Sequence, residues 1–133
     1  DSDPSAWRKT IELNLLGVYH CCREVAPRMI EAGGGKIINV GSGAGHSARA
    51  GNSAYDASKA AVWHLTRTLA MELWQHGIDL TKDVFPQPSN APPLAASERV
   101  KSPEECIELA LFLAAHPPGG PTGQTFSLAR RPL

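Results

Sequence analysis

Apolar residues recur every three or four positions over the first thirty residues, and this spacing predicts an amphipathic helix. The stripe consists of Trp7, Ile11, Leu15, Val18, Cys22, Val25 and Met29. Asp3 suits the N-cap and Pro4 the first helical position, so the helix is expected to begin there. Three consecutive glycines at positions 33–35 are expected to end it.

The middle of the chain changes from strand-like to loop-like to helical character. Residues 36–40 form a short β-branched run that predicts a buried strand. Residues 41–51 are rich in glycine, alanine and serine, as in a loop that approaches another group closely. Helical spacing returns from about Ser53 to Gln75, with Gly77 as its stop.

The last third of the chain is expected to add two strands and a helix. Residues 78–85 are expected to form a strand, although Asp79, Lys82 and Asp83 interrupt the apolar run that is usual in a central parallel strand. A proline-rich connection follows at residues 86–93, Pro103 begins a third helix, and a last strand is expected near residues 124–128. This alternation predicts an α/β layer with a parallel sheet, as one unit over residues 1–133.

Composition excludes several classes of partner. Thirteen basic residues balance thirteen acidic ones, which provides no bulk charge for binding nucleic acid or an anionic membrane. No stretch approaches the roughly 20 apolar residues of a membrane span, and the polar start lacks the character of a signal peptide. Three cysteines, at positions 21, 22 and 106, do not suggest a secreted disulfide framework. We therefore expect a soluble, cytoplasmic protein.

Tyr55 and Lys59 form a candidate pair for chemistry, because residues four apart on a helix project from the same face. A tyrosine hydroxyl is a poor base at neutral pH, and a nearby ammonium favours its phenolate form. A tyrosine tuned in this way can exchange a proton with an alcohol or a carbonyl oxygen. The spacing alone also occurs on many helices that have no catalytic role.

Two further polar residues occupy positions where a site can form. Ser42 follows the first predicted strand, and strand ends in open α/β sheets present ligand-binding groups. Asn14 lies on the stripe of the first helix, where a polar side chain needs a hydrogen-bonding partner. Taken singly, each is more often structural: a turn serine, and an asparagine that satisfies backbone groups.

Three segments together resemble successive motifs of the short-chain dehydrogenase/reductase family. They are Asn14-Leu15-Leu16-Gly17, Ile38-Asn39-Val40-Gly41-Ser42-Gly43-Ala44-Gly45 and Tyr55-Asp56-Ala57-Ser58-Lys59-Ala60-Ala61. The distance from Ser42 to Tyr55 is also similar to that of the family, and the resemblance covers nearly the whole chain. It implies a Rossmann-like, doubly wound parallel sheet, of which this chain would hold the C-terminal, catalytic part.

The resemblance implies an oxidoreductase that interconverts an alcohol and a carbonyl compound by hydride transfer, with NAD or NADP as cofactor. Tyr55 would be the general acid/base, and Lys59 would favour its phenolate and hold the nicotinamide ribose. Ser42 would position the reacting oxygen, and Asn14 would hold a water that links Lys59 to a proton relay. The family also implies a homo-oligomer that packs through two long helices, here residues 7–31 and 53–75.

Two features depart from the family pattern. The glycine-rich strand-turn-helix that binds the dinucleotide pyrophosphate does not occur in this sequence, so NAD and NADP are not distinguished. After Phe85 the family usually shows Pro-Gly and then a threonine, whereas Gln87 replaces the glycine here and Ala91 the threonine. These departures leave an alternative open: a truncated, non-catalytic relative that acts as an interaction or regulatory piece, or has no function.

Other chemistries find less support in the sequence. Ser42 has Val40 instead of glycine two residues before it, unlike the nucleophile elbow of serine hydrolases. Glycines 41, 43 and 45 are not followed by the Gly-Lys-Ser/Thr of a phosphate-binding loop. The histidines and cysteines lack metal-binding spacing, so no metal site is expected. A substrate pocket would be shaped by residues 49–53 and 88–99, whose composition selects no substrate.

Overall fold

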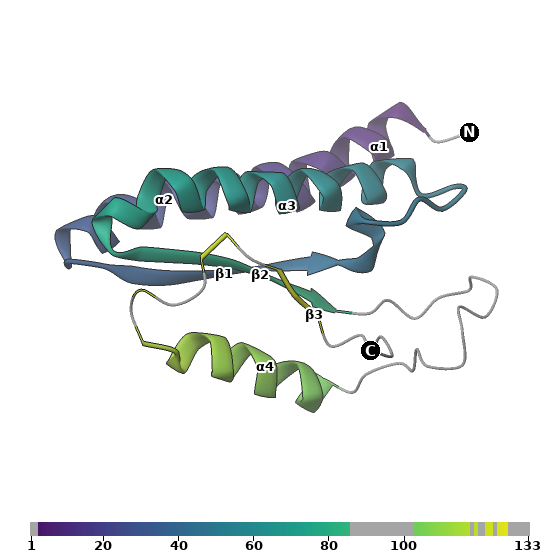
Figure 1. Cartoon of the computed structure of the whole chain (residues 1–133). Coiled ribbons are helices and arrows are strands. Elements are labelled where there is room, and N and C mark those ends of the chain that lie inside the picture. Colours follow the sequence, from purple (N-terminus) through teal and green to yellow (C-terminus); the bar gives the residue numbers. More distant parts are fainter. Residues whose placement is uncertain (1–2, 86–102, 118, 120–121, 124, 128–133) are drawn as a thin grey trace.

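Helices cover both faces of a small parallel sheet in the computed structural model, which describes residues 3–85, 103–117, 119, 122–123 and 125–127. The sheet has the strand order β1-β2-β3, and its strands are Gly35–Ser42, Ile78–Phe85 and Thr125–Ser127. Both neighbouring pairs are parallel. Figure 1 shows the N-terminal helices and α3 (Ser53–Leu73) on one face and α4 (Pro103–Ala115) on the other. The predicted α/β class is confirmed.

The first predicted helix is present, with one departure from regular geometry. It consists of α1 (Pro4–Ile11), a π-helical turn η1 (Glu12–Leu16) and α2 (Gly17–Glu31). Asp3 caps it as expected, because its carboxylate accepts a hydrogen bond from the backbone N of Ser5 at 3.1 Å. The sequence did not predict the π-helical turn, a feature that often marks functional positions. This turn contains Asn14.

The second long helix ends where the glycine pattern predicts. After α3 and the short turn η3 (Trp74–His76), Gly77 adopts a left-handed conformation with φ 71°. The chain packs closely at this point, since a Cβ on Gly34 would lie 2.8 Å from the carbonyl oxygen of Gly77. Glycine at position 34 therefore allows the start of β1 to approach the end of the helix.

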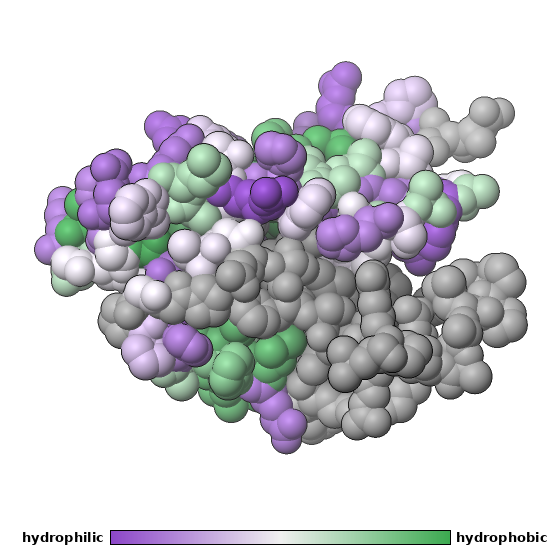
Figure 2. All heavy atoms as spheres, in the orientation of Figure 1, coloured by the Kyte–Doolittle hydropathy of each residue, from purple (hydrophilic) through white to green (hydrophobic). Residues whose placement is uncertain are grey.

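An apolar core lies between the sheet and the two long helices. Strand residues Ile37, Ile78 and Leu80 pack there with Cys22 of α2 and Ala70 of α3. On the opposite face of the sheet, α4 exposes large apolar side chains: Ile107, Leu111 and Phe112 are each more than half exposed, and Figure 2 shows green atoms beside purple ones in this region. No helix in the described part of the chain is long and apolar enough to cross a bilayer.

A buried polar network lies beside this core. The Asn39 side-chain amide of β1 donates to the Thr66 hydroxyl of α3 at 2.9 Å, and Thr66 donates in turn to the carbonyl oxygen of Val62 at 2.8 Å. Both Asn39 and Thr66 are buried. Buried polar groups need such partners, so this network fixes the position of α3 on β1.

A charged pair explains why β2 tolerates the acidic residue that made its sequence unusual. Asp79 of β2 is the register partner of Lys36 of β1, and the Lys36 ammonium lies 3.9 Å from the Asp79 carboxylate. Lys36 also donates to the carbonyl oxygen of His116, after α4, at 2.7 Å. The predicted strand at residues 78–85 is thus confirmed, with its first charge paired across the sheet.

Candidate active site at the carboxyl end of strand β1

Ser42 is the last residue of β1, and its side chain is buried. Its hydroxyl oxygen accepts a hydrogen bond from the backbone N of Ala44 at 3.2 Å and so caps the short turn η2 (Gly43–Gly45). A hydroxyl that accepts in this way still carries its own proton, which it can donate to another oxygen. Ser42 thus lies at the end of the strand, as the sequence predicts, and its hydroxyl is held by the turn that follows.

Tyr55 and Lys59 occupy the first two turns of α3. The Lys59 ammonium lies 5.8 Å from the centre of the Tyr55 ring and donates to the carbonyl oxygen of Val40 at 3.2 Å. Val40 is two residues before Ser42 on β1. Lys59 therefore connects the helix that carries Tyr55 to the strand that ends in Ser42.

Lys59 is partly removed from water, and this burial lowers its pKa below the usual value of a lysine. The cause is the cost of holding a charge where solvent is excluded. As the pH rises, Lys59 loses its proton before an exposed lysine does. Any step that needs the ammonium of Lys59 therefore weakens earlier on the alkaline side.

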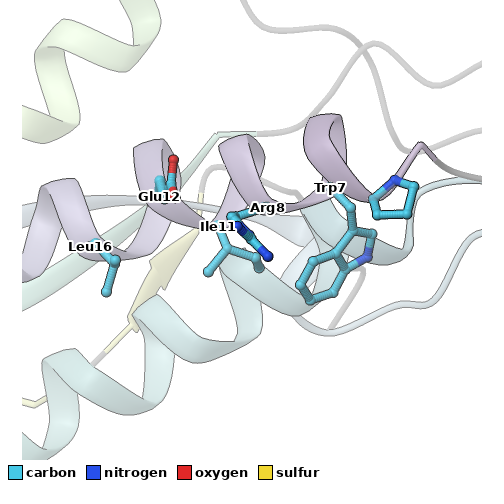
Figure 3. Close-up of a pocket in the computed structure, with 6 residues that line it drawn as sticks. Trp7, Arg8, Ile11, Glu12 and Leu16 are labelled. Carbon is cyan, nitrogen blue, oxygen red and sulfur yellow. The ribbon is translucent and has the colours of Figure 1, made fainter.

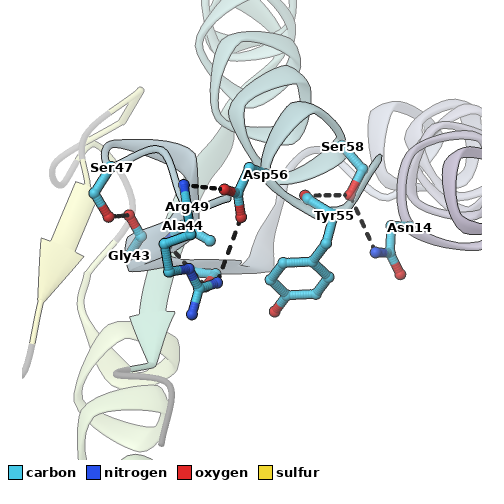
Figure 4. Close-up of polar contacts among 9 residues, drawn as sticks. Asn14, Gly43, Ala44, Ser47, Arg49, Tyr55, Asp56 and Ser58 are labelled. Carbon is cyan, nitrogen blue, oxygen red and sulfur yellow. Dashed lines mark hydrogen bonds and ion pairs between the residues drawn. The ribbon is translucent and has the colours of Figure 1, made fainter. Parts of the chain in front are cut away.

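Asn14 contacts the same helix one turn from the tyrosine. From the π-helical turn η1, its side-chain amide donates to the Ser58 hydroxyl at 3.1 Å, and Ser58 donates to the carbonyl oxygen of Tyr55 at 2.7 Å (Figure 4). Ser58 is buried between the two helices. Asn14 thus finds the partner that its place on the apolar stripe requires, and its amide oxygen remains an acceptor.

Sequence reasoning did not single out Asp56 and Ser58, which lie between Tyr55 and Lys59. Asp56 accepts a hydrogen bond from the backbone N of Arg49 at 2.9 Å and pairs with the Arg49 guanidinium at 3.4 Å. The segment before α3 is thereby tied to the first turn of that helix. An acidic residue directly after the tyrosine was the available signal, but its partner could not be read from spacing.

An open groove runs along the N-terminal helix, apart from Asn14, Ser42, Tyr55 and Lys59. Its volume is about 570 Å³, and none of these four predicted site residues lines it (Figure 3). Its lining residues are Pro4, Trp7, Arg8, Ile11, Glu12 and Leu16.

Among the described residues, no cluster of three histidine, cysteine or acidic side chains could hold a metal ion. The departures at Gln87 and Ala91, and the predicted pocket residues 88–99, lie outside the described residues.

Comparison with known proteins adds to this geometry. Residues 1–92 match the family model described as short chain dehydrogenase. The chain belongs to the short-chain dehydrogenase/reductase family. The four candidate site residues of this short-chain dehydrogenase/reductase chain all lie within the matched segment, and the predicted family resemblance is confirmed.

Individual relatives of this short-chain dehydrogenase/reductase chain agree in sequence and in fold. A 3-oxoacyl-(acyl-carrier-protein) reductase of Synechocystis sp. is 35% identical, over 92% of this chain and 54% of its own length. An acetoin dehydrogenase from Enterobacter cloacae has a TM-score of 0.83 at 29% identity, over 96% of this chain and 55% of its own.

A 3-oxoacyl-(acyl-carrier protein) reductase with bound NAD, from Brucella melitensis, also has a TM-score of 0.83, at 28% identity, over 96% of this chain and 52% of its own. The chain thus spans about half the length of the relatives it matches. Their likeness assigns its sheet and helices to part of a Rossmann-like fold.

Proposed function

We propose that this protein is an NAD(P)-dependent oxidoreductase that interconverts an alcohol and a carbonyl compound, with Tyr55 as general acid/base. One observation carries the proposal: the Lys59 ammonium lies against both the Tyr55 ring and the carboxyl end of the strand that finishes at Ser42. Three residues that match the family motifs thereby gather at one strand end, the position at which α/β sheets bind ligands.

The donors of Lys59 fit the ribose of a nicotinamide dinucleotide. An ammonium has three N–H donors, and one of them is used by the Val40 carbonyl oxygen. Among the residues that the structure describes, two donors therefore remain for ribose hydroxyls, and we assign cofactor binding to Lys59 together with the Tyr55 hydroxyl. The bound nicotinamide ring supplies the hydride for reduction and accepts it in oxidation.

The side chains of the protein supply the proton and the orientation. During reduction, Tyr55 donates its proton to the carbonyl oxygen as the carbon gains a hydride, and in the reverse direction it removes the proton of the alcohol. The Ser42 hydroxyl donates a hydrogen bond to the same oxygen and holds it in place. The Lys59 ammonium stabilises the phenolate that remains after Tyr55 has given up its proton.

Asn14 belongs to this proposal as the residue that replenishes the proton. Its amide nitrogen is held by Ser58, so the amide oxygen has a fixed direction in the π-helical turn. We propose that this oxygen holds a water that connects Lys59 with solvent. Asn14 would then be a positioning residue, because it acts through Lys59 and does not touch the substrate.

We also propose a domain assignment, an oligomeric state and a cellular location for the protein. We assign residues 1–133 to one partial Rossmann-like domain that acts on small molecules and forms a homo-oligomer through the two long helices. The exposed side chains of Leu13, Leu16 and Tyr19 on the first of these helices support such packing. Cys21 and Cys22 are free thiols, which fits a reducing cytoplasm.

A turnover assay with a serine substitution tests the function. Purified protein is mixed with NADH or NADPH and a panel of ketones, and loss of nicotinamide fluorescence is followed. We expect Ser42→Ala to lower ketone-dependent oxidation about 10²-fold, because the reacting oxygen loses a hydrogen-bond donor. Ser47→Ala is the control, since the exposed Ser47 hydroxyl donates to the backbone carbonyl oxygen of Gly43 within the same turn.

The two variants separate catalysis from loop structure. Equal losses in Ser42→Ala and Ser47→Ala would contradict a role for Ser42 at the reacting oxygen. Absence of any ketone-dependent oxidation by the folded, unsubstituted protein would favour the non-catalytic alternative.

A further inference from the structure

Arg49 lies in the segment that connects Ser42 and its turn η2 with the first turn of α3, where Tyr55 is found. Its side chain is three-quarters buried, with 25% exposed. In Figure 4 the Arg49 guanidinium and the Tyr55 ring extend on the same side of this turn. Arg49 is therefore placed to meet part of a substrate whose reacting oxygen is held at Tyr55.

Asp56 holds the backbone of Arg49 and lies beside its guanidinium. One Asp56 carboxylate oxygen accepts from the backbone N of Arg49 at 2.9 Å, and the other lies 3.4 Å from its Nη2. The segment is closed further by Asn52, whose backbone N donates to the Arg49 carbonyl oxygen at 3.3 Å and whose own carbonyl oxygen accepts from the backbone N of Asp56 at 2.9 Å. The backbone that carries the Arg49 side chain is thus held in place before a ligand binds, which lowers the entropic cost of binding.

The guanidinium nevertheless has donors that Asp56 does not use. Arginine carries five N–H donors, and within the described part of the chain the Asp56 carboxylate is the one acidic group recorded against them. The contact of 3.4 Å is longer than the roughly 2.7–2.9 Å of a strong charge-assisted hydrogen bond. The Arg49 Nε is buried and has no acceptor among the residues that the structure describes. A buried donor without an acceptor is costly, and a ligand oxygen that paired with it would remove that cost.

We propose that Arg49 binds a carboxylate of the substrate, so that the substrate is a hydroxy acid or the corresponding oxo acid. This proposal rests on the function proposed above. The planar guanidinium matches the two oxygens of a carboxylate, which an ammonium does not. Asp56 already balances the positive charge of Arg49, so recognition depends on directed hydrogen bonds. A doubly charged phosphate would be repelled more strongly by Asp56 than a singly charged carboxylate is.

The test compares acids with neutral molecules of the same size. The full chain, labelled with ¹⁵N, is titrated with lactate and with 3-hydroxypropionate, and the resonance of the Arg49 Nε–H is followed by NMR. Propane-1,2-diol and propane-1,3-diol are the neutral counterparts, in which a CH₂OH group replaces the carboxylate. We expect a saturable shift with at least one acid and none with either diol.

Three variants separate binding from folding. Arg49→Gln is expected to lower acid affinity at least tenfold, measured by calorimetry, whereas Arg67→Gln, which changes an arginine over the Trp63 ring, is expected to leave it unchanged. Asp56→Asn keeps an oxygen for the Arg49 backbone but removes the charge, so acid affinity is expected to rise severalfold. If Arg49→Gln does not fold, the Asp56→Asn result decides.

Several results would overturn the proposal. They are equal Nε–H shifts with acids and diols, acid affinity that Arg49→Gln leaves intact, or acid affinity that Asp56→Asn leaves unchanged. The assay of neutral ketones keeps the two proposals apart. Turnover of ketones without acid binding overturns the role of Arg49 alone, and acid binding without any turnover overturns the proposed oxidoreductase alone.

Discussion

Replacing Tyr55 with phenylalanine is expected to lower turnover about 10²–10⁴-fold, the range that general acid/base catalysis contributes. The change removes one oxygen atom and its proton and keeps the aromatic ring beside Lys59. The fold should therefore be retained, since the ring still fills its place on α3. Steady-state kinetics with a reducible ketone, together with thermal unfolding of both proteins, provide the measurement.

The chain offers a matched control for this substitution. Tyr19 is its other tyrosine and lies on α2 with 40% of its surface exposed, so Tyr19→Phe makes the same chemical change elsewhere. Turnover by Tyr19→Phe should stay near that of the unsubstituted protein. Full activity in Tyr55→Phe would remove Tyr55 from the role of acid/base, whatever the behaviour of the control.

Replacing Gly45 with alanine is expected to destabilise the protein by about 1–3 kcal/mol, as overpacking of a dense site typically does. A Cβ at this position would lie 2.9 Å from the carbonyl oxygen of Lys59 and 3.0 Å from its carbonyl carbon. Both are backbone atoms of α3, so η2 must move away from the helix. Ser42, which caps η2, should move with it, and turnover should fall as well.

Gly43 provides the control for this experiment, because it lies in the same short turn. A Cβ on Gly43 would meet no atom within 4 Å, and Gly43→Ala is expected to change stability by less than about 0.5 kcal/mol. Urea denaturation of the two variants gives both free energies of unfolding. Equal free energies of unfolding in the two variants would contradict the prediction, because they would show that η2 can move away from α3 at little cost.

Much of the fold follows from local pattern. The stripe that begins at Trp7, the cap at Asp3 and the stop at Gly77 each reflect contacts within a few residues, and the structure has all three. The charged residues of β2 were harder to interpret, because Lys36 pairs with Asp79 only once the register of two distant strands is known. No sequence feature predicts the π-helical turn that contains Asn14, because this turn packs against α3, which is distant in the sequence.

The same distinction between local pattern and long-range contact applies to the candidate site. Ser42, Tyr55 and Lys59 could be predicted because their residue types and spacing form a motif along the chain. The contacts around these residues could not be predicted, because they join residues far apart in the sequence. They are the hydrogen bonds of Asn14 with Ser58 and of Lys59 with Val40, and the close packing of Gly45 against the backbone of α3. Asp56 was within the motif, but its role became visible only with its partner Arg49 in place.

A titration of the 133-residue protein with NADH and NADPH shows whether the chain binds a nicotinamide cofactor. Binding is followed by quenching of the tryptophans at positions 7, 63 and 74 and by energy transfer to the nicotinamide. We expect saturable binding of at least one of the two nucleotides, and this binding should weaken as the pH rises because burial lowers the pKa of Lys59. We also expect Lys59→Met to weaken binding at least tenfold, whereas Lys9→Met, at an exposed position of α1, should have no effect. Absence of binding by the folded protein, or equal binding by both variants, would contradict a cofactor site at Lys59.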